Sequence, residues 1–410
     1  MDTLAIDVGS ENVGLCRWGS RGLHLARQPA EPPVDAWPRW IEALGPTSAY
    51  QVIYRCTHPA FRDRHKPQTI ARLAERHGAR QLRAIAEDLH ADPVSAAARY
   101  FAKQHRLPII CCVEAGAATI TAVVQNPRGA VSAFRRFPTE STSRESLGEV
   151  ARWLSAALAA TVKGSEVEGL DAVPLICFGG RGPSIAAQLA GDCGMASFLI
   201  PQQAGLFATI GMLLSDIVLN FEQALNATEI NLGQLRQAFR ELMDRASHAI
   251  TMEGYDLDDA VCLRIAQMAR AGDEHALEVD CDDLADISRL AEKFRTMRGV
   301  EAGGDETSRP IQVRAIRVKA VIEARTAGLL PAISSLSPSM AVAAPEWLRG
   351  FAPPAGAAIH TRHELTAGAK IEGPACVREA HSTTVIPPGW VAECTATGGL
   401  VVRRCTPVAG

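Results

Sequence analysis

Three short turns rich in small residues, each directly after an apolar run, constrain the fold of this chain more than any other feature. The first turn is Asp7-Val8-Gly9-Ser10, the second runs from Glu114 to Thr119, and the third runs from Gly179 to Pro183. An apolar run of four to eight residues that ends in a glycine turn is typical of a buried β-strand. The order strand, turn, strand occurs twice, over residues 3–18 and 107–124, which predicts two similar sheets facing one cleft.

The segments around these turns favour an α/β protein. Apolar residues recur at helical spacing over 67–106 and 145–162, which predicts helices there. A buried strand is expected at 173–178. The glycine turn after it should lead into a helix over 184–191, with Pro183 well placed as its first residue.

The remaining segments are less regular. The proline-rich stretch 29–48 predicts a loop with at most one helical turn. Residues 204–298 are expected to be largely helical, with a polar break near 226–231. The period-two alternation over 311–321 predicts a half-buried strand, after which short strands between glycines and prolines continue to the end of the chain.

A chain of 410 residues with 47% apolar residues can form two or three domains, each with its own core. We expect four segments along it. Residues 1–92 form a short N-terminal lobe, and residues 93–225 form a second lobe that carries the later turns. Residues 226–309 form a helical segment, and residues 310–410 form a small β-rich C-terminal domain packed on the second lobe.

The charge and cysteine content narrow the class of protein. A net charge of −3 and an isoelectric point near 6.4 provide no basic field of the kind that nucleic acids or membrane surfaces require. No basic leader and no apolar run of about 18 residues is present, which predicts a soluble, cytoplasmic protein without a membrane partner. The eleven cysteines include no C-x-x-C pair and are expected to be buried, reduced thiols.

The turns suit phosphate binding. Phosphate groups need backbone N–H donors at close range, and only small residues allow the backbone to approach them. An acidic residue at a strand end can hold Mg²⁺, and a nearby hydroxyl can contact phosphate oxygens. For any one turn taken alone, a tight turn without a ligand is the competing interpretation. The candidate cofactor-binding residues are Asp7, Gly9, Ser10, Glu114, Gly116, Thr119, Gly179, Gly180 and Gly182, and Asp7 and Glu114 are the candidate Mg²⁺ ligands.

Several longer motifs resemble one family. Phe178-Gly179-Gly180-Arg181-Gly182-Pro183, Ile200-Pro201 and the segment 208–216 resemble a block of the hydantoinase/oxoprolinase A-type subunits. Gly373-Pro374-Ala375 and Thr383-Thr384-Val385-Ile386-Pro387-Pro388-Gly389-Trp390 resemble the ending of the same subunits. In order, the resemblance covers about residues 93–400.

This resemblance implies a fold and a function. The fold would be the actin, heat-shock chaperone and sugar kinase type, with two actin-like (ribonuclease H-like) lobes around a cleft. The function would be that of an A-type subunit that binds ATP and Mg²⁺ and works with a B-type partner. The substrate would be a small amide or carbonyl compound, in cyclic amide hydrolysis or ketone carboxylation. A homo-oligomer is the alternative assembly.

The chain also departs from the family pattern. In the first turn only Asp7, Gly9 and the Ser10 hydroxyl remain, and Thr121 stands where the second turn usually has an acid. The region before residue 93 is short for the family. No catalytic residue is assigned from the sequence, and a catalytically degenerate scaffold or regulatory subunit, a pseudoenzyme, is the competing function.

Overall fold

The computed structural model describes most of the chain. The described residues are 2–46, 50–57, 61, 67–85, 92–125, 131–138, 144–162, 167, 169–227, 232–273, 276–281, 287–299, 310–324, 329–334 and 355–405. The chain divides into two compact units, one of residues 1–215 and 325–410 and one of residues 216–324. Within the described part of the chain, no helix is both long and apolar enough to span a membrane.

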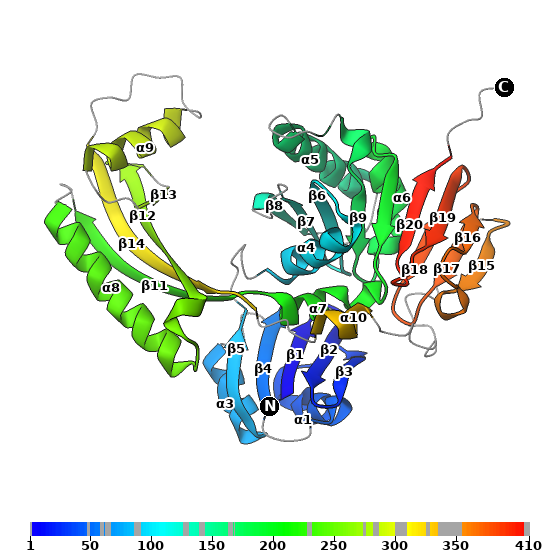
Figure 1. Ribbon diagram of the computed structural model, residues 1–410, viewed down its shortest axis with the longest axis horizontal. Helices are drawn as coiled ribbons and strands as arrows, with labels where there is room; N and C mark the ends of the chain where they lie inside the picture. Colours follow the sequence, from blue (N-terminus) through cyan, green and yellow to red (C-terminus); the bar gives the residue numbers. More distant parts are fainter. Residues whose placement is uncertain are drawn as a thin grey trace. The chain divides into compact units, whose positions relative to one another are not determined.

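The first lobe of the larger unit is built on a five-stranded sheet with the order β3-β2-β1-β4-β5 (Figure 1). Its strands are β1 (Asp2–Val8), β2 (Asn12–Gly19), β3 (Gly22–Pro29), β4 (Tyr50–Cys56) and β5 (Ala79–Ala84). The first three strands are antiparallel neighbours, while β4 runs parallel to β1 and β5 runs parallel to β4. Helices α1 (Pro33–Leu44) and α3 (Pro67–Arg76) complete the lobe, and Trp37 and Trp40 of α1 are buried in its core with Leu4 and Ile6.

The second lobe repeats this topology. Its sheet has the order β10-β9-β6-β7-β8, with β6 to β8 antiparallel and with β9 and β10 parallel to β6. The strands are β6 (Ile110–Ala115), β7 (Thr119–Gln125), β8 (Val131–Pro138), β9 (Leu175–Phe178) and β10 (Ser197–Ile200). The helices are α4 (Pro93–His105), α5 (Arg144–Val162), α6 (Gly182–Asp192) and α7 (Phe207–Leu214). The repeated strand order confirms the predicted fold class of two ribonuclease H-like, actin-like lobes.

The C-terminal tail extends the second-lobe sheet. Strand β20 (Leu400–Arg404) pairs antiparallel with β10, β19 (Trp390–Cys394) pairs with β20, and β16 (Lys370–Glu372) pairs with β19. A three-stranded sheet follows the order β15 (Ala358–Thr361), β17 (Ala375–Arg378) and β18 (Thr383–Ile386). Residues 358–404 therefore contain the β-structure that the sequence placed within 310–410, and three of these strands extend the second-lobe sheet. The short helix α10 (Leu329–Ser334) also belongs to this unit.

The smaller unit is an antiparallel sheet with two helices. The strand order is β11 (Ile217–Ala227), β14 (Ile311–Ile322), β12 (Ala260–Arg270) and β13 (Leu277–Asp280). Helices α8 (Leu232–Met252) and α9 (Ile287–Gly299) bury Phe239, Leu242 and Phe294 in a core shared with the sheet. Because the unit has its own core, it is an inserted domain between α7 and α10.

The structure overturns the largely helical prediction for residues 204–298. This region contains β11, β12 and β13 besides its helices, so the segment 226–309 is a mixed α/β part of the smaller unit. Strand β14 pairs with β11 and β12, so residues 311–322 belong to this unit and not to the C-terminal tail. Short apolar runs without strict alternation fit a helix or a strand equally well, and here long-range pairing decides.

Two smaller predictions were also wrong. Residues 33–44 form a twelve-residue helix instead of a loop with one turn. Pro33 stands in the first turn of α1, where its missing N–H has no partner to lose, so proline starts this helix instead of preventing it. Residues 79–84 form β5 instead of a helix, because Gly78, at φ +94°, ends the preceding helical turn and a parallel strand neighbour is available.

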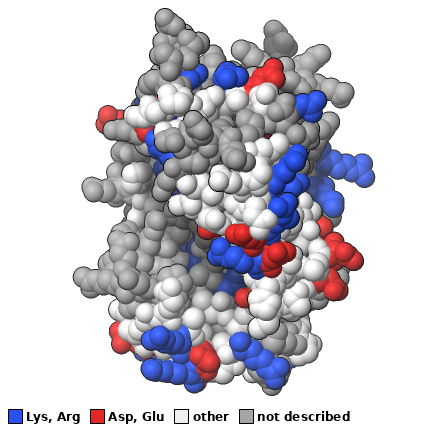
Figure 2. All heavy atoms as spheres, turned by 90° about the vertical axis from the view of Figure 1, so that its left-hand side faces the viewer, with Lys and Arg blue, Asp and Glu red and all other residues white. Residues whose placement is uncertain are grey.

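Charged side chains of both signs are interspersed on the face drawn in Figure 2, where Lys and Arg lie among Asp and Glu over the described residues. This distribution agrees with the small net charge of the sequence.

Candidate functional site

The two lobes carry the same turn at the same place. In the first lobe the Gly9 amide donates to the Asn12 carbonyl at 2.9 Å, and in the second the Gly116 amide donates to the Thr119 carbonyl at 2.9 Å. Each turn follows the central strand of its sheet, β1 or β6, and joins it to an antiparallel neighbour. A carboxylate stands near the end of each central strand, Asp7 on β1 and Glu114 on β6.

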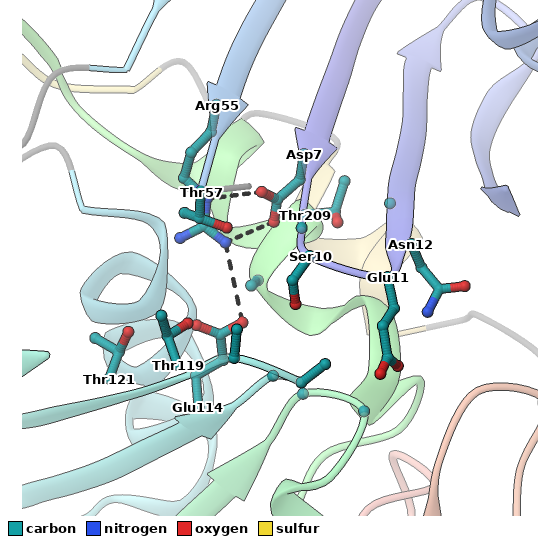
Figure 3. Close-up of a pocket in the computed structure, with 18 of the residues that line it drawn as sticks. Asp7, Ser10, Glu11, Asn12, Arg55, Thr57, Glu114, Thr119, Thr121 and Thr209 are labelled. Atoms are coloured by element: carbon teal, nitrogen blue, oxygen red, sulfur yellow. Dashed lines mark hydrogen bonds and ion pairs between the residues drawn. The ribbon is translucent and has the colours of Figure 1, made fainter. Parts of the chain in front are cut away.

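Both turns face one pocket of about 290 Å³ in the larger unit (Figure 3). Of the nine residues predicted from the sequence, eight line this pocket: Asp7, Gly9, Ser10, Glu114, Gly116, Thr119, Gly179 and Gly180. Gly182 lines no part of it. Gly182 is buried at the start of α6, where the nearest neighbour of an added Cβ would be the Cys177 carbonyl carbon at 3.6 Å, an ordinary contact.

The turns leave backbone donors free. Among the described residues, the amide groups of Ser10, Glu11, Ala117 and Ala118 donate to no other group. All four residues line the pocket, two from each lobe. A cavity lined by unpaired backbone N–H groups suits the oxygens of a phosphate or a carboxylate.

The third turn is fixed against the second. Gly179 has φ +87°, and an added Cβ would lie 2.5 Å from the Ala115 carbonyl oxygen, so only glycine fits there. Its amide donates to the Ala204 carbonyl at 2.9 Å, and the Arg181 amide donates to the Ala115 carbonyl at 3.0 Å. The Gly179-Gly180 turn is therefore positioned by the end of β6, beside the second turn.

Arg55 is the central functional side chain that the sequence reasoning missed. It lies on β4, and its guanidinium donates to both carboxylate oxygens of Asp7, from Nε at 2.8 Å and from Nη2 at 2.5 Å (Figure 3). The same Nη2 lies 4.0 Å from Glu114 Oε1. The Arg55 side chain is 8% exposed, so a buried cation joins the carboxylates of the two lobes. The available signal was an arginine near the end of the apolar run Val52-Ile53-Tyr54.

Three further arginines line the pocket: Arg27, Arg136 and Arg181. Arg136 lies 3.1 Å from the carboxylate of Asp92, which also accepts the Ser95 amide at the start of α4. Arg181 lies 3.6 Å from the Glu11 carboxylate.

Arg27 donates to the His381 carbonyl at 3.0 Å, and burial lowers the pKa of Arg27 to about 10. The four lining arginines outnumber the three lining carboxylates, which are Asp7, Glu11 and Glu114. A fourth carboxylate, that of Asp92, pairs with Arg136 without lining the pocket, so it is the guanidinium groups facing the pocket, and not an excess of positive charge, that suit an anion.

The two equivalent carboxylates differ in their environment. Burial raises the pKa of Glu114, and the nearby Asp7 and Asp92 carboxylates raise it further against the opposing effect of Arg55. Burial lowers the pKa of Arg55, but the carboxylates of Asp7 and Glu114 outweigh that effect, so its pKa is raised and it stays charged. Arg55 therefore keeps its positive charge, while burial disfavours the ionised form of Glu114 and so raises its pKa.

The predicted pair of Mg²⁺ ligands does not fit this arrangement. Both oxygens of Asp7 accept hydrogen bonds from Arg55, and the same guanidinium lies within ion-pair distance of Glu114. A metal ion bridging these carboxylates would have to displace a buried guanidinium. The described residues also contain no group of three or more His, Cys, Asp or Glu side chains spaced to hold a metal ion.

Comparisons with known proteins agree with the family resemblance. Residues 152–220 match the hydantoinase/oxoprolinase family. An uncharacterized protein of Methanocaldococcus jannaschii is 27% identical over 234 residues, which cover 55% of this chain and 33% of that protein. The caprolactamase subunit alpha of Pseudomonas jessenii is 23% identical over 228 residues, which cover 53% of this chain and 33% of that subunit. The aligned region thus spans about a third of the length of these curated relatives.

Two solved structures are also similar. Nucleotide-free acetone carboxylase matches with a TM-score of 0.49 and 12% identity, over 95% of this chain and 81% of that chain. The ATP-dependent caprolactamase from Pseudomonas jessenii matches with a TM-score of 0.47 and 13% identity, over 95% of this chain and 81% of that chain. The matched segment, the curated relative and the motifs quoted above thus make the chain similar to the hydantoinase/oxoprolinase family.

Proposed function

We propose that the pocket of the larger unit binds the phosphate groups of ATP, and that the chain is the nucleotide-binding, A-type component of an ATP-dependent enzyme. The observation that supports this most is the pair of equivalent turns, each with two unpaired backbone amides, that line one pocket together with four arginines. A polyphosphate is long and anionic enough to contact both turns at once.

The lining residues divide into roles. The amides of Ser10 and Glu11 would hold one part of the phosphate chain, and those of Ala117 and Ala118 another. The Gly179-Gly180 turn would border the nucleoside, as the sequence predicted. The lining arginines would compensate the phosphate charge, because a positively charged site stabilises both the bound nucleotide and the charge of a transferring phosphoryl group.

The reaction that this arrangement favours is activation of a carbonyl group. The γ-phosphoryl group would pass from ATP to the oxygen of a small cyclic amide or of an enolate, breaking its bond to ADP and forming a new P–O bond. Water would then add to the carbonyl carbon of a phosphorylated amide, the ring C–N bond would break to give an acyl phosphate, and a second water would release phosphate. An enol phosphate would instead lose its phosphoryl group to water, and the enolate carbon so released would attack carbon dioxide. This chemistry needs groups beyond those in the pocket, so we propose a B-type partner that supplies them. One curated relative is itself named as a subunit alpha, which supports this assembly.

A catalytically degenerate scaffold is the second candidate function. The observation in its favour is the bidentate Arg55–Asp7 pair, which occupies a carboxylate that a metal-dependent phosphoryl transfer would need. Such a scaffold could still bind ATP. The two candidates therefore differ in turnover with the partner present and not in binding.

Calorimetric titration of ATP into the full chain tests the binding proposal. The matched variants are Gly116→Val, which fills the second turn, and Gly148→Val, which lies on α5 outside the pocket. A Cβ at Gly116 would lie 3.6 Å from the Thr119 carbonyl oxygen and one at Gly148 would lie 3.5 Å from the Arg152 side chain, so both backbones accept a side chain. We expect Gly116→Val to weaken ATP binding by about tenfold or more, equivalent to about 1.4 kcal/mol, and Gly148→Val to leave it unchanged.

Two outcomes would contradict the proposal. Failure of the wild-type chain to bind ATP would remove the nucleotide function. Equal binding by wild type and Gly116→Val would place the nucleotide outside this pocket.

A further inference from the structure

We infer that Arg55 takes the place of a divalent cation in this pocket, so that the chain binds its phosphate ligand without Mg²⁺. The inference deepens the proposed function and rests on it for the identity of the ligand. The claim about Arg55 is independent of the proposed function, because binding of a metal ion alone can test it.

The first reason is position. The Arg55 guanidinium is hydrogen-bonded to both oxygens of Asp7 and lies 4.0 Å from Glu114, which are the two carboxylates best placed to hold a metal ion. The Arg55 and Asp7 side chains are only 8% and 10% exposed. Because neither partner can leave the other without burying an unpaired charge, the pair has little freedom to open for a metal ion.

The second reason is the remaining donor of Arg55. Nε and Nη2 serve Asp7, whereas Nη1 donates to no other residue in the described part of the chain. Arg55 nevertheless lines the pocket, and Nη1 is not among the buried side-chain nitrogens that lack a partner. A guanidinium held at one edge by a carboxylate can offer its free nitrogen to a phosphate oxygen, which gives the positive charge of a cation at a fixed position.

The third reason is the charge of the whole pocket. Four arginines, Arg55 among them, line the pocket, so a phosphate chain would meet cationic groups there without a metal ion. Arg55 also has a raised pKa through its carboxylate neighbours, so this positive charge does not depend on pH in the physiological range. The site therefore has a built-in counter-ion for an anionic ligand.

The experiment compares cation binding and ATP binding in four proteins: wild type, Asp7→Asn, Arg55→Gln and Arg55→Lys. Binding of Mn²⁺ alone, used as a spectroscopic substitute for Mg²⁺, is followed by electron paramagnetic resonance. Binding of ATP is followed by calorimetry with a chelator or with Mg²⁺. The double variant Asp7→Asn/Arg55→Gln serves as the control for the position of any metal ion.

We expect wild type to bind ATP with chelator about as tightly as with Mg²⁺, within about threefold. Wild type should not bind Mn²⁺ through Asp7. Arg55→Gln should lose about tenfold or more in ATP affinity with chelator and regain part of it with Mg²⁺. The same variant should gain a Mn²⁺ site that the double variant lacks, and Arg55→Lys should remain independent of the metal because it keeps the positive charge.

Three outcomes would overturn the inference. One is ATP binding by wild type that is more than about tenfold tighter with Mg²⁺ than with chelator. Another is a wild-type Mn²⁺ site that disappears in Asp7→Asn. The third is retention of full, metal-independent ATP binding by Arg55→Gln. If wild type binds no ATP under either condition, the proposed function fails while the Mn²⁺ measurements still decide the role of Arg55. If Arg55→Gln does not fold, wild type, Asp7→Asn and Arg55→Lys still give the first two outcomes.

Discussion

The turn after β1 and the turn after β6 have the same backbone and different chemistry. Both are closed by a glycine amide that donates to a carbonyl at 2.9 Å, and both have a carboxylate near the preceding strand end. Asp7 is held by two short hydrogen bonds from Arg55, whereas Glu114 lies 4.0 Å from the same guanidinium and is 17% exposed. The repeated fold therefore places the backbone amides and the carboxylates at equivalent positions in the two lobes. Arg55, on the neighbouring strand β4, makes the two carboxylates differ in their interactions.

Removal of the Arg55 guanidinium should have the largest effect on stability, because it removes the ion pair that distinguishes Asp7 from Glu114. Arg55→Leu leaves the Asp7 carboxylate buried without its partner, which should lower the free energy of unfolding by about 3–5 kcal/mol. The control is Arg135→Ala, because the Arg135–Glu149 pair is about half exposed on both sides and should contribute less than about 1 kcal/mol. Urea denaturation of both variants provides the measurement. Equal losses in the two variants would mean that the Arg55–Asp7 pair is no stronger than a surface ion pair.

Neutralising Asp7 and Glu114 in separate variants should lower the free energy of unfolding by unequal amounts. Asp7→Asn removes the charge from two hydrogen bonds to Arg55 and should cost about 1.5–3 kcal/mol of unfolding free energy. Glu114→Gln loses only a distant ion pair and should cost less than about 1 kcal/mol. The same denaturation experiment measures both. A larger loss for Glu114→Gln would reverse the assignment of the paired acid.

The two glycine positions in the second lobe should also differ. Gly179→Ala places a Cβ 2.5 Å from the Ala115 carbonyl at φ +87°, and the resulting strain should cost about 1–3 kcal/mol. Gly116→Ala meets only an ordinary contact at 3.6 Å and should change stability by less than about 1 kcal/mol. Thermal unfolding of the two variants is sufficient to compare them. Similar melting temperatures would show that the third turn is not fixed by β6.

The smallest expected effect concerns pH. The pKa of Glu114 is raised above its usual 4.5 by burial, so the folded chain binds this proton more tightly than the unfolded chain does. Its contribution to stability is therefore favourable at low pH and is lost as the pH rises from about 4.5 through the higher pKa of the folded chain. Glu114→Gln lacks this titration. The unfolding free energy of the variant relative to wild type should thus increase with pH, and a constant difference would contradict the raised pKa.

Local patterns predicted the elements that meet at the pocket. The helix after the third turn was predicted from Pro183, and α6 begins one residue earlier, at Gly182. The hairpins at both turns and the strand before Gly179 were predicted from apolar runs that end in glycine. Eight of nine candidate residues line the pocket for the same reason. The exception, Gly182, could not be distinguished from the adjacent glycines by sequence pattern, because all three belong to the same glycine turn.

The rest depended on long-range contacts. Strands β11 and β12 were mistaken for helices because both pair with β14, which lies far along the chain and leaves no local pattern. Strand β13, which was also mistaken for a helix, pairs with its near neighbour β12. Arg55 was missed because its partner, Asp7, is 48 residues away. The sequence shows that Asp7 follows an apolar run but not that a guanidinium pairs with its carboxylate. Only the structure could therefore show that the predicted Mg²⁺ ligand is paired with Arg55.

A crystal structure of the full chain with a non-hydrolysable ATP analogue tests the central claim most directly. The account predicts phosphate oxygens within hydrogen-bonding distance of the Ser10 or Glu11 amide and also of the Ala117 or Ala118 amide, with Arg55 still paired to Asp7. An analogue bound outside this pocket, or a metal ion held between Asp7 and Glu114 with Arg55 displaced, would contradict it.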